Sequence, residues 1–153
     1  MTTETRQHIH EEVFSVSPER LFAILHTPSA IRRWWSAARV VVLPEPGGTW
    51  AAAWGDEEDD PDYISVAKIR HFERPRRMVL ADYNYLSRSG ELSFDASFVV
   101  EFLVLSHPEG AVLRVTQDGF PVTTDADDFL KGCVIGWRET FAGIRKYFED
   151  AGA

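Results

Sequence analysis

The feature that most constrains this chain is a long amphipathic segment at residues 124–150. Apolar side chains recur there at intervals of three and four, the spacing that aligns side chains along one face of an α-helix. They are Leu130, Cys133, Val134, Trp137, Phe141, Ile144 and Phe148. At ~1.5 Å per residue the helix is on the order of 38 Å long. We therefore expect a wide apolar surface elsewhere in the chain to cover this stripe.

Charges and a capping pattern mark both ends of this predicted helix. Thr124 with Asp127 three residues later is typical of a capped N-terminus. Acidic residues near the start complement the positive end of the helix dipole, and Arg145 and Lys146 complement the negative end. The sequence thus predicts one continuous helix over residues 124–150.

Three glycines form a strip beside the apolar stripe. Gly132, Gly136 and Gly143 are four and seven residues apart, although each costs roughly 0.5–1 kcal/mol relative to alanine inside a helix. Absent side chains allow either close packing of the helix on a sheet or room for a ligand. Close packing is the more ordinary cause, and the sequence leaves both explanations open.

Composition limits the classes of protein to consider. The chain has 153 residues and 44% hydrophobic content, which fits a single globular domain over residues 1–153. Its net charge of −8 argues against nucleic acid or an anionic membrane as a partner. Residues 1–12 lack the apolar core of a secretory signal, and no apolar run approaches the roughly 18 residues of a membrane span. We therefore expect a cytoplasmic protein.

Turn and breaker residues divide the rest of the chain into short elements. A strand at 6–16 ends at Ser17-Pro18, which predicts a capped short helix, and Pro28 begins a second short helix with Thr27 or Ser29 as cap. Strand patterns follow at 40–43, 49–54, 63–72, 78–86, 94–105 and 111–120. A sheet of successive hairpins needs cover across its apolar face, and only the final helix is long enough to supply it.

The alternation of side chains predicts which strand faces point inward. In 94–105 the apolar residues Phe94, Ala96, Phe98, Val100, Phe102 and Val104 share one face. In 111–120 the same parity turns Gln117 inward. Both faces of 78–86 are mixed, so the pattern leaves open whether Tyr83 and Tyr85 or Asp82 and Asn84 face the core.

Short motifs spread over nearly the whole chain resemble the START/SRPBCC superfamily, which includes the birch-pollen-allergen-like proteins. The most similar branch is the one named after the activator of the heat-shock-protein-90 ATPase. The motifs are VSPERLFAIL (16–25), RWW (33–35), EPGGTW (45–50), ERPRRMVL (73–80), DGF (118–120) and the glycine–tryptophan pair at 136–137.

The resemblance implies an α+β helix-grip fold. A curved antiparallel sheet of about six or seven strands would wrap around the long C-terminal helix, with two short helices after the first strand. Many relatives hold a hydrophobic small molecule in a cavity between sheet and helix. The acidic insertion at 56–62 and the segment 82–94 depart from the family pattern. The eukaryotic co-chaperones also carry a further N-terminal domain without counterpart in this sequence, so chaperone activation has little support.

Catalytic and metal motifs are weak in this sequence. His8 and His10 would share a strand face, but no further ligand completes a metal site, so we interpret them as exposed histidines. The acidic run at 55–62 lacks the spacing and glycine of a calcium loop, which favours a solvated hairpin loop. Hydrolase, zincin, Walker and dinucleotide motifs are not found. We assign no catalytic residue, metal or cofactor.

The aromatic residues are the stronger functional signal. If the helix-grip geometry is correct, many of them converge between sheet and helix in an apolar chamber, as in small-molecule sites. The candidate ligand-binding residues are Trp34, Trp35, Trp50, Trp54, Phe98, Phe102, Gln117, Cys133, Gly136, Trp137 and Phe141. Arg114, Glu101 and Asp82 are further polar candidates. The competing interpretation is that the aromatic rings only fill the core, where Cys133 would be a buried, inert thiol.

Three functions follow from these patterns. The leading hypothesis is a non-enzymatic protein that binds an apolar or aromatic small molecule. The second is a cyclase- or hydrolase-type enzyme, which requires an acid or base within reach of a bound substrate. The third is a protein-interaction module akin to the co-chaperones, which requires a large exposed apolar patch. The identity of the ligand and a homodimeric state stay open.

Overall fold

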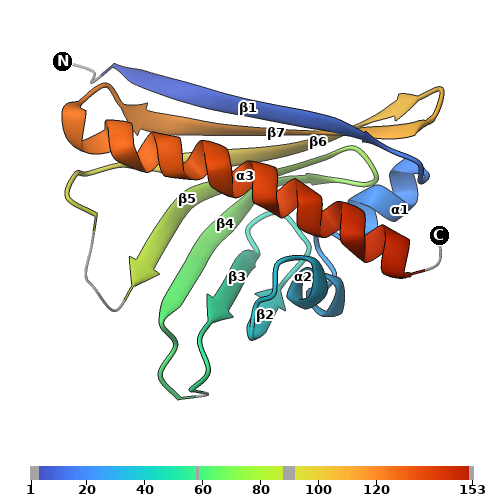
Figure 1. Ribbon diagram of the computed structural model, residues 1–153, viewed down its shortest axis with the longest axis horizontal. Coiled ribbons are helices and arrows are strands. Elements are labelled where there is room, and N and C mark those ends of the chain that lie inside the picture. Colours follow the sequence, from blue (N-terminus) through green and yellow to red (C-terminus); the bar gives the residue numbers. More distant parts are fainter. Residues whose placement is uncertain (1–3, 58, 88–91, 152–153) are drawn as a thin grey trace.

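A computed structural model describes residues 4–57, 59–87 and 92–151, and within them one antiparallel sheet of seven strands and three helices (Figure 1). The strands are β1 (Thr5–Phe14), β2 (Arg39–Val42), β3 (Thr49–Trp54), β4 (Tyr63–Glu73), β5 (Arg77–Ser87), β6 (Phe98–His107) and β7 (Gly110–Pro121). The helices are α1 (Pro18–Ala23), α2 (Pro28–Trp34) and α3 (Thr124–Asp150). The predicted α+β helix-grip fold is confirmed.

The strand order β1-β7-β6-β5-β4-β3-β2 places the first strand beside the last. The chain therefore reaches the opposite edge of the sheet through α1 and α2, after which every strand pairs with the one before it. The curved sheet leaves one concave face, and α3 runs across that face from the end of β7 (Figure 1). The long helix thus lies across the apolar side of the sheet, where α1 also packs against β6 and β7.

The short helices begin where the prolines predict. The Ser17 hydroxyl accepts the Arg20 backbone N–H at 3.2 Å, and Pro18 occupies the first helical position. The N-cap residue of α2 is Thr27 rather than Ser29. The Thr27 hydroxyl donates to the Ala23 carbonyl at 2.7 Å. That hydrogen bond joins the end of α1 to the start of α2.

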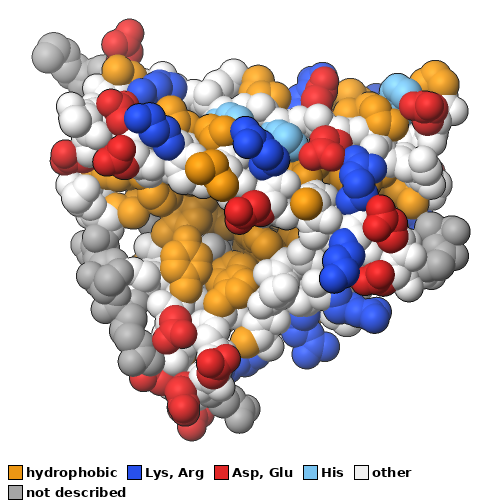
Figure 2. All heavy atoms as spheres, in the orientation of Figure 1, with side chains coloured by type: hydrophobic (Ala, Val, Ile, Leu, Met, Phe, Trp, Pro, Cys, Tyr) orange, Lys and Arg blue, Asp and Glu red, His pale blue; other side chains and the backbone are white. Residues whose placement is uncertain are grey.

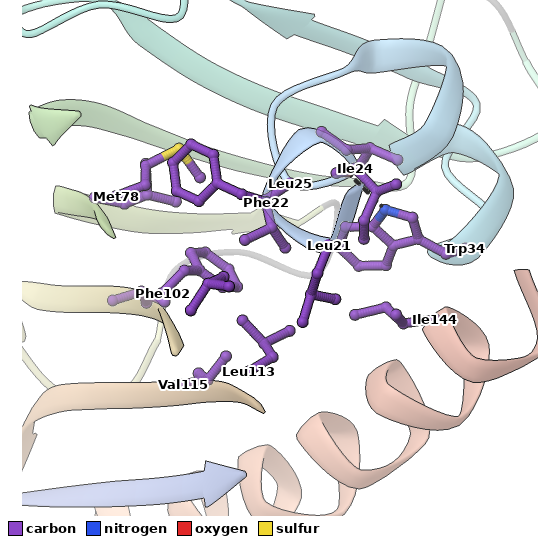
Figure 3. Packing of buried hydrophobic residues seen from close by; sticks show 14 of the residues in the cluster. Leu21, Phe22, Ile24, Leu25, Trp34, Met78, Phe102, Leu113, Val115 and Ile144 are labelled. Carbon is purple, nitrogen blue, oxygen red and sulfur yellow. Dashed lines mark hydrogen bonds between the residues drawn. The ribbon is translucent and has the colours of Figure 1, made fainter. Parts of the chain in front are cut away.

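The densest part of the core lies under α1 and the C-terminal half of α3. Figure 3 shows Leu21 and Phe22 of α1 among side chains from β5, β6, β7 and α3. Leu21, Phe102, Leu113, Val115 and Ile144 are all nearly inaccessible to solvent. Fully burying an aliphatic or aromatic side chain contributes about 1.5–3 kcal/mol each, so this region anchors the helix to the sheet.

The long helix has the predicted length of 27 residues, but its cap and its last turn differ from the prediction. Thr123 is the N-cap, because its extended backbone lets its hydroxyl accept the Ala126 N–H, whereas Thr124 is already helical. Arg145 does not act at the helix end. Its guanidinium donates to the Glu12 carboxylate at 2.7 Å and to the Val13 carbonyl at 3.1 Å, which ties α3 to β1.

The apolar stripe of α3 is buried unevenly. Trp137, Phe141, Ile144 and Phe148 are buried, whereas the side chains one to two turns earlier, such as Leu130 and Cys133, are half-buried. The C-terminal half of the helix therefore packs in the core, and the N-terminal half lies over the sheet with less cover.

A bulge in β5 explains why its inward face was ambiguous in the sequence. Met78 and Leu80 point into the core, the pairing with β6 then shifts between Leu80 and Tyr83, and Asp82 has a positive φ of 51°. The extra residue reverses the alternation. Tyr83 and Tyr85 consequently face inward, and Asp82 is exposed.

Other strand predictions need small corrections. β6 begins at Phe98, because Phe94 and Ala96 precede the strand and are only half-buried. The interval between the predicted strands 78–86 and 94–105 lies partly outside the described residues. The described part of the acidic run at 55–62 forms the loop between β3 and β4, and most of its side chains are exposed, as predicted.

The interpretation of His8 and His10 as exposed is wrong. Both are half-buried on the face of β1 toward α3, whereas Ile9 between them is 50% exposed. The His10 ring packs edge-on against Phe141 at 4.5 Å, and its Nε2 lies 2.7 Å from Glu12. In β1 the histidines face inward and Ile9 faces outward, which is the opposite of what their hydrophobicity suggests. The reason is that α3 packs against the face of β1 that carries the histidines. Among the described residues no trio of His, Cys, Asp or Glu is placed to hold a metal.

A membrane span is likewise not found in the described part of the chain, where every helix is too short or too polar to cross a bilayer.

The two ends of the glycine strip should respond oppositely to alanine. A Cβ on Gly143 would overlap the Trp34 carbonyl oxygen of α2, whereas a Cβ on Gly132 would meet no atom within 4 Å. We expect Gly143→Ala to lower the free energy of unfolding by about 1–3 kcal/mol through overpacking. Gly132→Ala should raise it by about 0.5–1 kcal/mol through helix propensity. Urea denaturation of both variants measures the two changes, and equal effects would contradict the close contact at Gly143.

Candidate ligand-binding pocket

A pocket of about 780 Å³ lies between the N-terminal half of α3, the concave face of β3, β4 and β5, and the end of α2. Figure 2 shows the molecular surface hollowed below α3, with hydrophobic side chains at its floor. The side chains and glycines that line it are Trp34, Trp35, Ser36, Trp54, Tyr63, Ser65, Tyr83, Tyr85, Asp128, Phe129, Gly132, Cys133, Gly136, Trp137, Glu139, Thr140 and Gly143.

Aromatic rings form a continuous band around this pocket. Each ring touches the next, from the α2 end across the strands to α3, with centroids about 5–6 Å apart, the usual spacing of aromatic pairs. The contacts are Trp34–Trp35 at 5.3 Å, Trp35–Trp54 at 5.1 Å, Trp54–Tyr63 at 5.4 Å, Tyr63–Tyr85 at 6.1 Å and Tyr85–Phe129 at 5.3 Å. The wall of the pocket is therefore built mainly of ring faces and edges held by their neighbours.

The indole N–H groups in this band are bound to the protein itself. Trp34 donates to the Ile24 carbonyl at 2.9 Å, and Trp54 donates to the Trp35 carbonyl at 3.0 Å. Trp35 donates to the Thr140 hydroxyl at 3.1 Å, which joins the α2 end to α3. These bonds fix the ring orientations, and a ligand would meet the π surfaces rather than free indole donors.

The glycine strip serves two purposes. No atom lies within 4 Å of the position that a Cβ on Gly132 or Gly136 would occupy, so both open onto empty space beside the pocket. Gly143 instead allows the backbone of α2 to approach α3 closely, at Trp34. Close packing is thus found at Gly143, against α2 rather than the sheet, and open space is found at Gly132 and Gly136, where room for a ligand stays a prediction.

A buried amide connects α3 to the sheet behind the pocket wall. Gln117 of β7 is fully inaccessible to solvent, as its predicted inward parity requires. Its Oε1 accepts the Trp137 indole N–H at 2.7 Å, and its Nε2 donates to the Tyr85 hydroxyl at 3.0 Å. Gln117 therefore orients two pocket-lining side chains, Trp137 and Tyr85, without lining the pocket itself.

Burial keeps the ionisable groups inside the pocket neutral. Desolvation raises the pKa of the Tyr63 hydroxyl to about 12, partly opposed by a hydrogen bond with Ser65, and raises the pKa of the Cys133 thiol to about 12. The pKa values of Tyr83 and Tyr85 are raised by burial as well. The charged side chains that line the pocket, Asp128 and Glu139, are exposed and lie at its rim.

The structure brings six of the eleven candidate residues together at the pocket. Trp34, Trp35, Trp54, Cys133, Gly136 and Trp137 line it. Trp50, Phe98, Phe102, Gln117 and Phe141 are buried and do not line it. Trp50 supports Trp35 from behind at 5.4 Å, Phe98 supports Tyr85 at 5.7 Å, and Phe102 supports Trp137 at 6.0 Å. Contact of any of these residues with a ligand stays a prediction.

The remaining polar candidates, for which the strand alternation predicted no clear inward orientation, do not line the pocket. Arg114 pairs with Glu11 at 2.8 Å, and Glu101 pairs with Arg77 at 2.7 Å. Asp82 is exposed at the β5 bulge. Charged residues in sheet interiors are rare unless paired, and here each faces away from α3.

The candidate set missed several lining residues. Phe129, Cys133, Gly136 and Thr140 repeat at helical spacing, so Phe129 and Thr140 could have been found as a second stripe of α3. Tyr83 and Tyr85 were hidden by the bulge. Tyr63 and Ser65 enter the site only because β4 lies opposite the uncovered half of the helix.

Comparison with known proteins agrees with the fold and gives a family. Residues 15–149 match the family described as Activator of Hsp90 ATPase homolog 1-like protein. No curated protein matches the chain.

Solved structures with a similar fold match almost the full length of this chain. Protein MLL2253 from Mesorhizobium loti is 21% identical with a TM-score of 0.77, and the match covers 95% of this chain and 98% of that one. SA2116 from Staphylococcus aureus, a protein of unknown function, is 10% identical with a TM-score of 0.76, covering 98% and 97%. CalU16 from Micromonospora echinospora is 14% identical with a TM-score of 0.67, covering 94% and 76%. At these identities the likeness concerns the fold alone.

Removing the buried amide should destabilise the protein through its partners. In Gln117→Met the Trp137 N–H loses its acceptor in a buried site, which costs about 1–3 kcal/mol of unfolding free energy. Adding Trp137→Phe removes the indole N–H that has lost its acceptor. The fall in unfolding free energy of the double variant should therefore be smaller than the sum of the falls in the two single variants. Chemical denaturation of the three variants measures this coupling. Strict additivity would show that the Gln117–Trp137 hydrogen bond does not form.

The single cysteine should react slowly in the folded protein. With its pKa raised from 9.0 to about 12, the thiolate fraction at pH 8 falls about 1,000-fold relative to the unfolded chain. Alkylation by iodoacetamide, followed by mass spectrometry in buffer and in urea, should show a difference of that order. Because the folded pKa is the higher one, the contribution of this thiol to stability is complete below pH 9 and is lost toward pH 12. A native rate within tenfold of the urea rate would contradict the raised pKa.

Proposed function

This chain belongs to the family of Activator of Hsp90 ATPase homolog 1-like proteins, and on that premise we propose that it binds an apolar or aromatic small molecule in the pocket beneath α3. The observation that carries the proposal is the aromatic-lined space of about 780 Å³. Pockets that hold small molecules typically measure ~300–1,000 Å³ and are walled by apolar and aromatic side chains with a few polar groups.

Two further features support a binding role. The empty space beside Gly132 and Gly136 is maintained although glycine is unfavourable in a helix, which is expected where a side chain would obstruct a ligand. The ring orientations are fixed by internal hydrogen bonds from Trp34, Trp35 and Trp54. A pocket that is already ordered loses little conformational entropy when it binds.

The chemistry of the pocket favours binding over catalysis. An enzyme of the cyclase or hydrolase kind needs an acid or base held at the reacting atom. The raised pKa values of Tyr63, Tyr85 and Cys133 keep these groups protonated at neutral pH and make them poor bases. The carboxylates of Asp128 and Glu139 lie at the rim, away from the enclosed wall.

A leucine at position 136 should block the pocket without unfolding the protein. Its side chain would extend into the space that is empty next to Gly136, and helix propensity favours leucine over glycine by up to about 1 kcal/mol. We expect Gly136→Leu to weaken binding of the neutral fluorescent probe N-phenyl-1-naphthylamine at least tenfold with an unchanged or higher melting temperature. Fluorescence titration and a thermal melt measure the two effects.

Ala142→Leu is the matched control, because it adds the same side chain to an exposed position of α3 that does not line the pocket. This control should bind the probe like the unmodified protein. Equal probe binding by Gly136→Leu and Ala142→Leu, or no binding by the unmodified protein, would contradict the proposed function. A large fall in melting temperature for Gly136→Leu would indicate close packing at Gly136 instead.

A further inference from the structure

The charged residues that line the pocket all have one sign. Of the residues that line it, Asp128 and Glu139 are acidic, and no Lys, Arg or His is among them. Both carboxylates are exposed, and neither forms an ion pair with another residue that the structure describes. Their charge is therefore available to a ligand at the opening.

The two carboxylates occupy opposite ends of the opening along α3. They are eleven residues apart on the helix, which corresponds to about 16 Å at ~1.5 Å per residue. Asp128 precedes Phe129, which contacts Tyr85, and Glu139 precedes Thr140, which accepts the Trp35 indole N–H. Each carboxylate thus lies beside a different end of the aromatic band, and the pair is too widely spaced to share one ion.

The aromatic band favours positive charge over negative charge. The faces of Trp, Tyr and Phe rings carry negative electrostatic potential and attract cations, most strongly for Trp. Because the indole N–H groups of Trp34, Trp35 and Trp54 are bound within the protein, the strongest hydrogen-bond donors of these rings are not available to an anion. The ring faces of the wall can attract a cation, and carboxylates line the same pocket.

An anionic ligand would find no counter-charge in the same pocket. Its charge would lose hydration among neutral hydroxyl, thiol and ring groups, at a substantial cost. Positively charged residues do line a separate, smaller pocket of about 380 Å³, which shares Trp34, Ser36 and Gly143 with the first. Arg33 and Lys146 lie in that smaller pocket together with Asp150. This arrangement places positive charge beyond the aromatic band rather than within it.

We propose that the pocket selects cationic aromatic ligands, meaning aromatic or polycyclic amines whose ring system lies within the aromatic band and whose ammonium group lies at the rim beside Glu139 or Asp128. This inference rests on the proposed function and names the chemical class of its ligand. It also explains why the charge at the opening is negative while the enclosed wall is neutral.

A series of ligands with one ring system and three charges tests this selectivity. The probes are 2-naphthylmethylamine, which is cationic at pH 7, neutral 2-naphthylmethanol and anionic 2-naphthylacetate. Quenching of tryptophan fluorescence gives the three dissociation constants at low salt. We expect the amine to bind roughly tenfold more tightly than the alcohol, from cation–π attraction together with an exposed ion pair. The acetate should bind more weakly than the alcohol.

Charge-neutral variants identify the source of the preference. In Asp128→Asn with Glu139→Gln the ratio of amine to alcohol affinity should fall to about threefold or less, because the ammonium group loses its ionic partners. Glu149→Gln is the matched control, since Glu149 is an exposed acid on α3 that lines neither pocket, and it should keep the full ratio. Added salt should also reduce the ratio, because exposed charges are screened.

The outcomes separate this inference from the proposed function. If the alcohol binds and Gly136→Leu abolishes that binding, but the amine binds no more tightly, the inference fails and the proposed function stands. Tightest binding by the acetate, weakened by Lys146→Gln, would overturn the inference in favour of an anionic ligand. An unchanged ratio in the double variant would also overturn it. Failure of all three probes to bind would contradict the proposed function itself.

Discussion

One straight helix has to cover a curved sheet, and the rest of the structure depends on that mismatch. The C-terminal half of α3, with Phe141, Ile144 and Phe148 buried, packs against α2 and β1. Strands β3, β4 and β5 extend away from α3 (Figure 1). The pocket lies between these strands and the helix. A well-packed anchor at one end therefore allows an open space at the other, since stability does not require contact along the whole stripe.

Buried polar contacts then define where the helix lies above the sheet. Gln117 binds Trp137 of α3 and Tyr85 of β5 at once, within a region closed to solvent. Because an unpaired buried amide or indole is costly, this arrangement tolerates little displacement of α3 along the sheet. Trp35 adds a second connection through Thr140. The width of the pocket is thus set by specific hydrogen bonds as well as by apolar packing.

Electrostatics divides the same site into two zones. The enclosed wall has π surfaces and neutral hydroxyl and thiol groups, whose pKa values are raised by burial. The rim has unpaired carboxylates, in keeping with the net charge of −8. A neutral wall with a charged rim suits an amphipathic molecule, because apolar and ionic parts can each meet a favourable environment.

The sequence by itself determined the fold and six of the residues that line the site. Periodicity located α3, alternation turned Gln117 inward, and prolines marked α1 and α2, because each of these signals is local in the chain. Only the tertiary structure decided which aromatic residues face open space. The β5 bulge turned Tyr83 and Tyr85 inward. The distance between α3 and the sheet decided that Trp54 lines the pocket whereas Trp50 is buried behind the lining residues. It also divided the glycines, since close contact at Gly143 and empty space at Gly136 depend on where α2 meets α3. A pocket forms where elements that are remote in sequence lie apart in space. That distance leaves no local pattern in the amino-acid sequence.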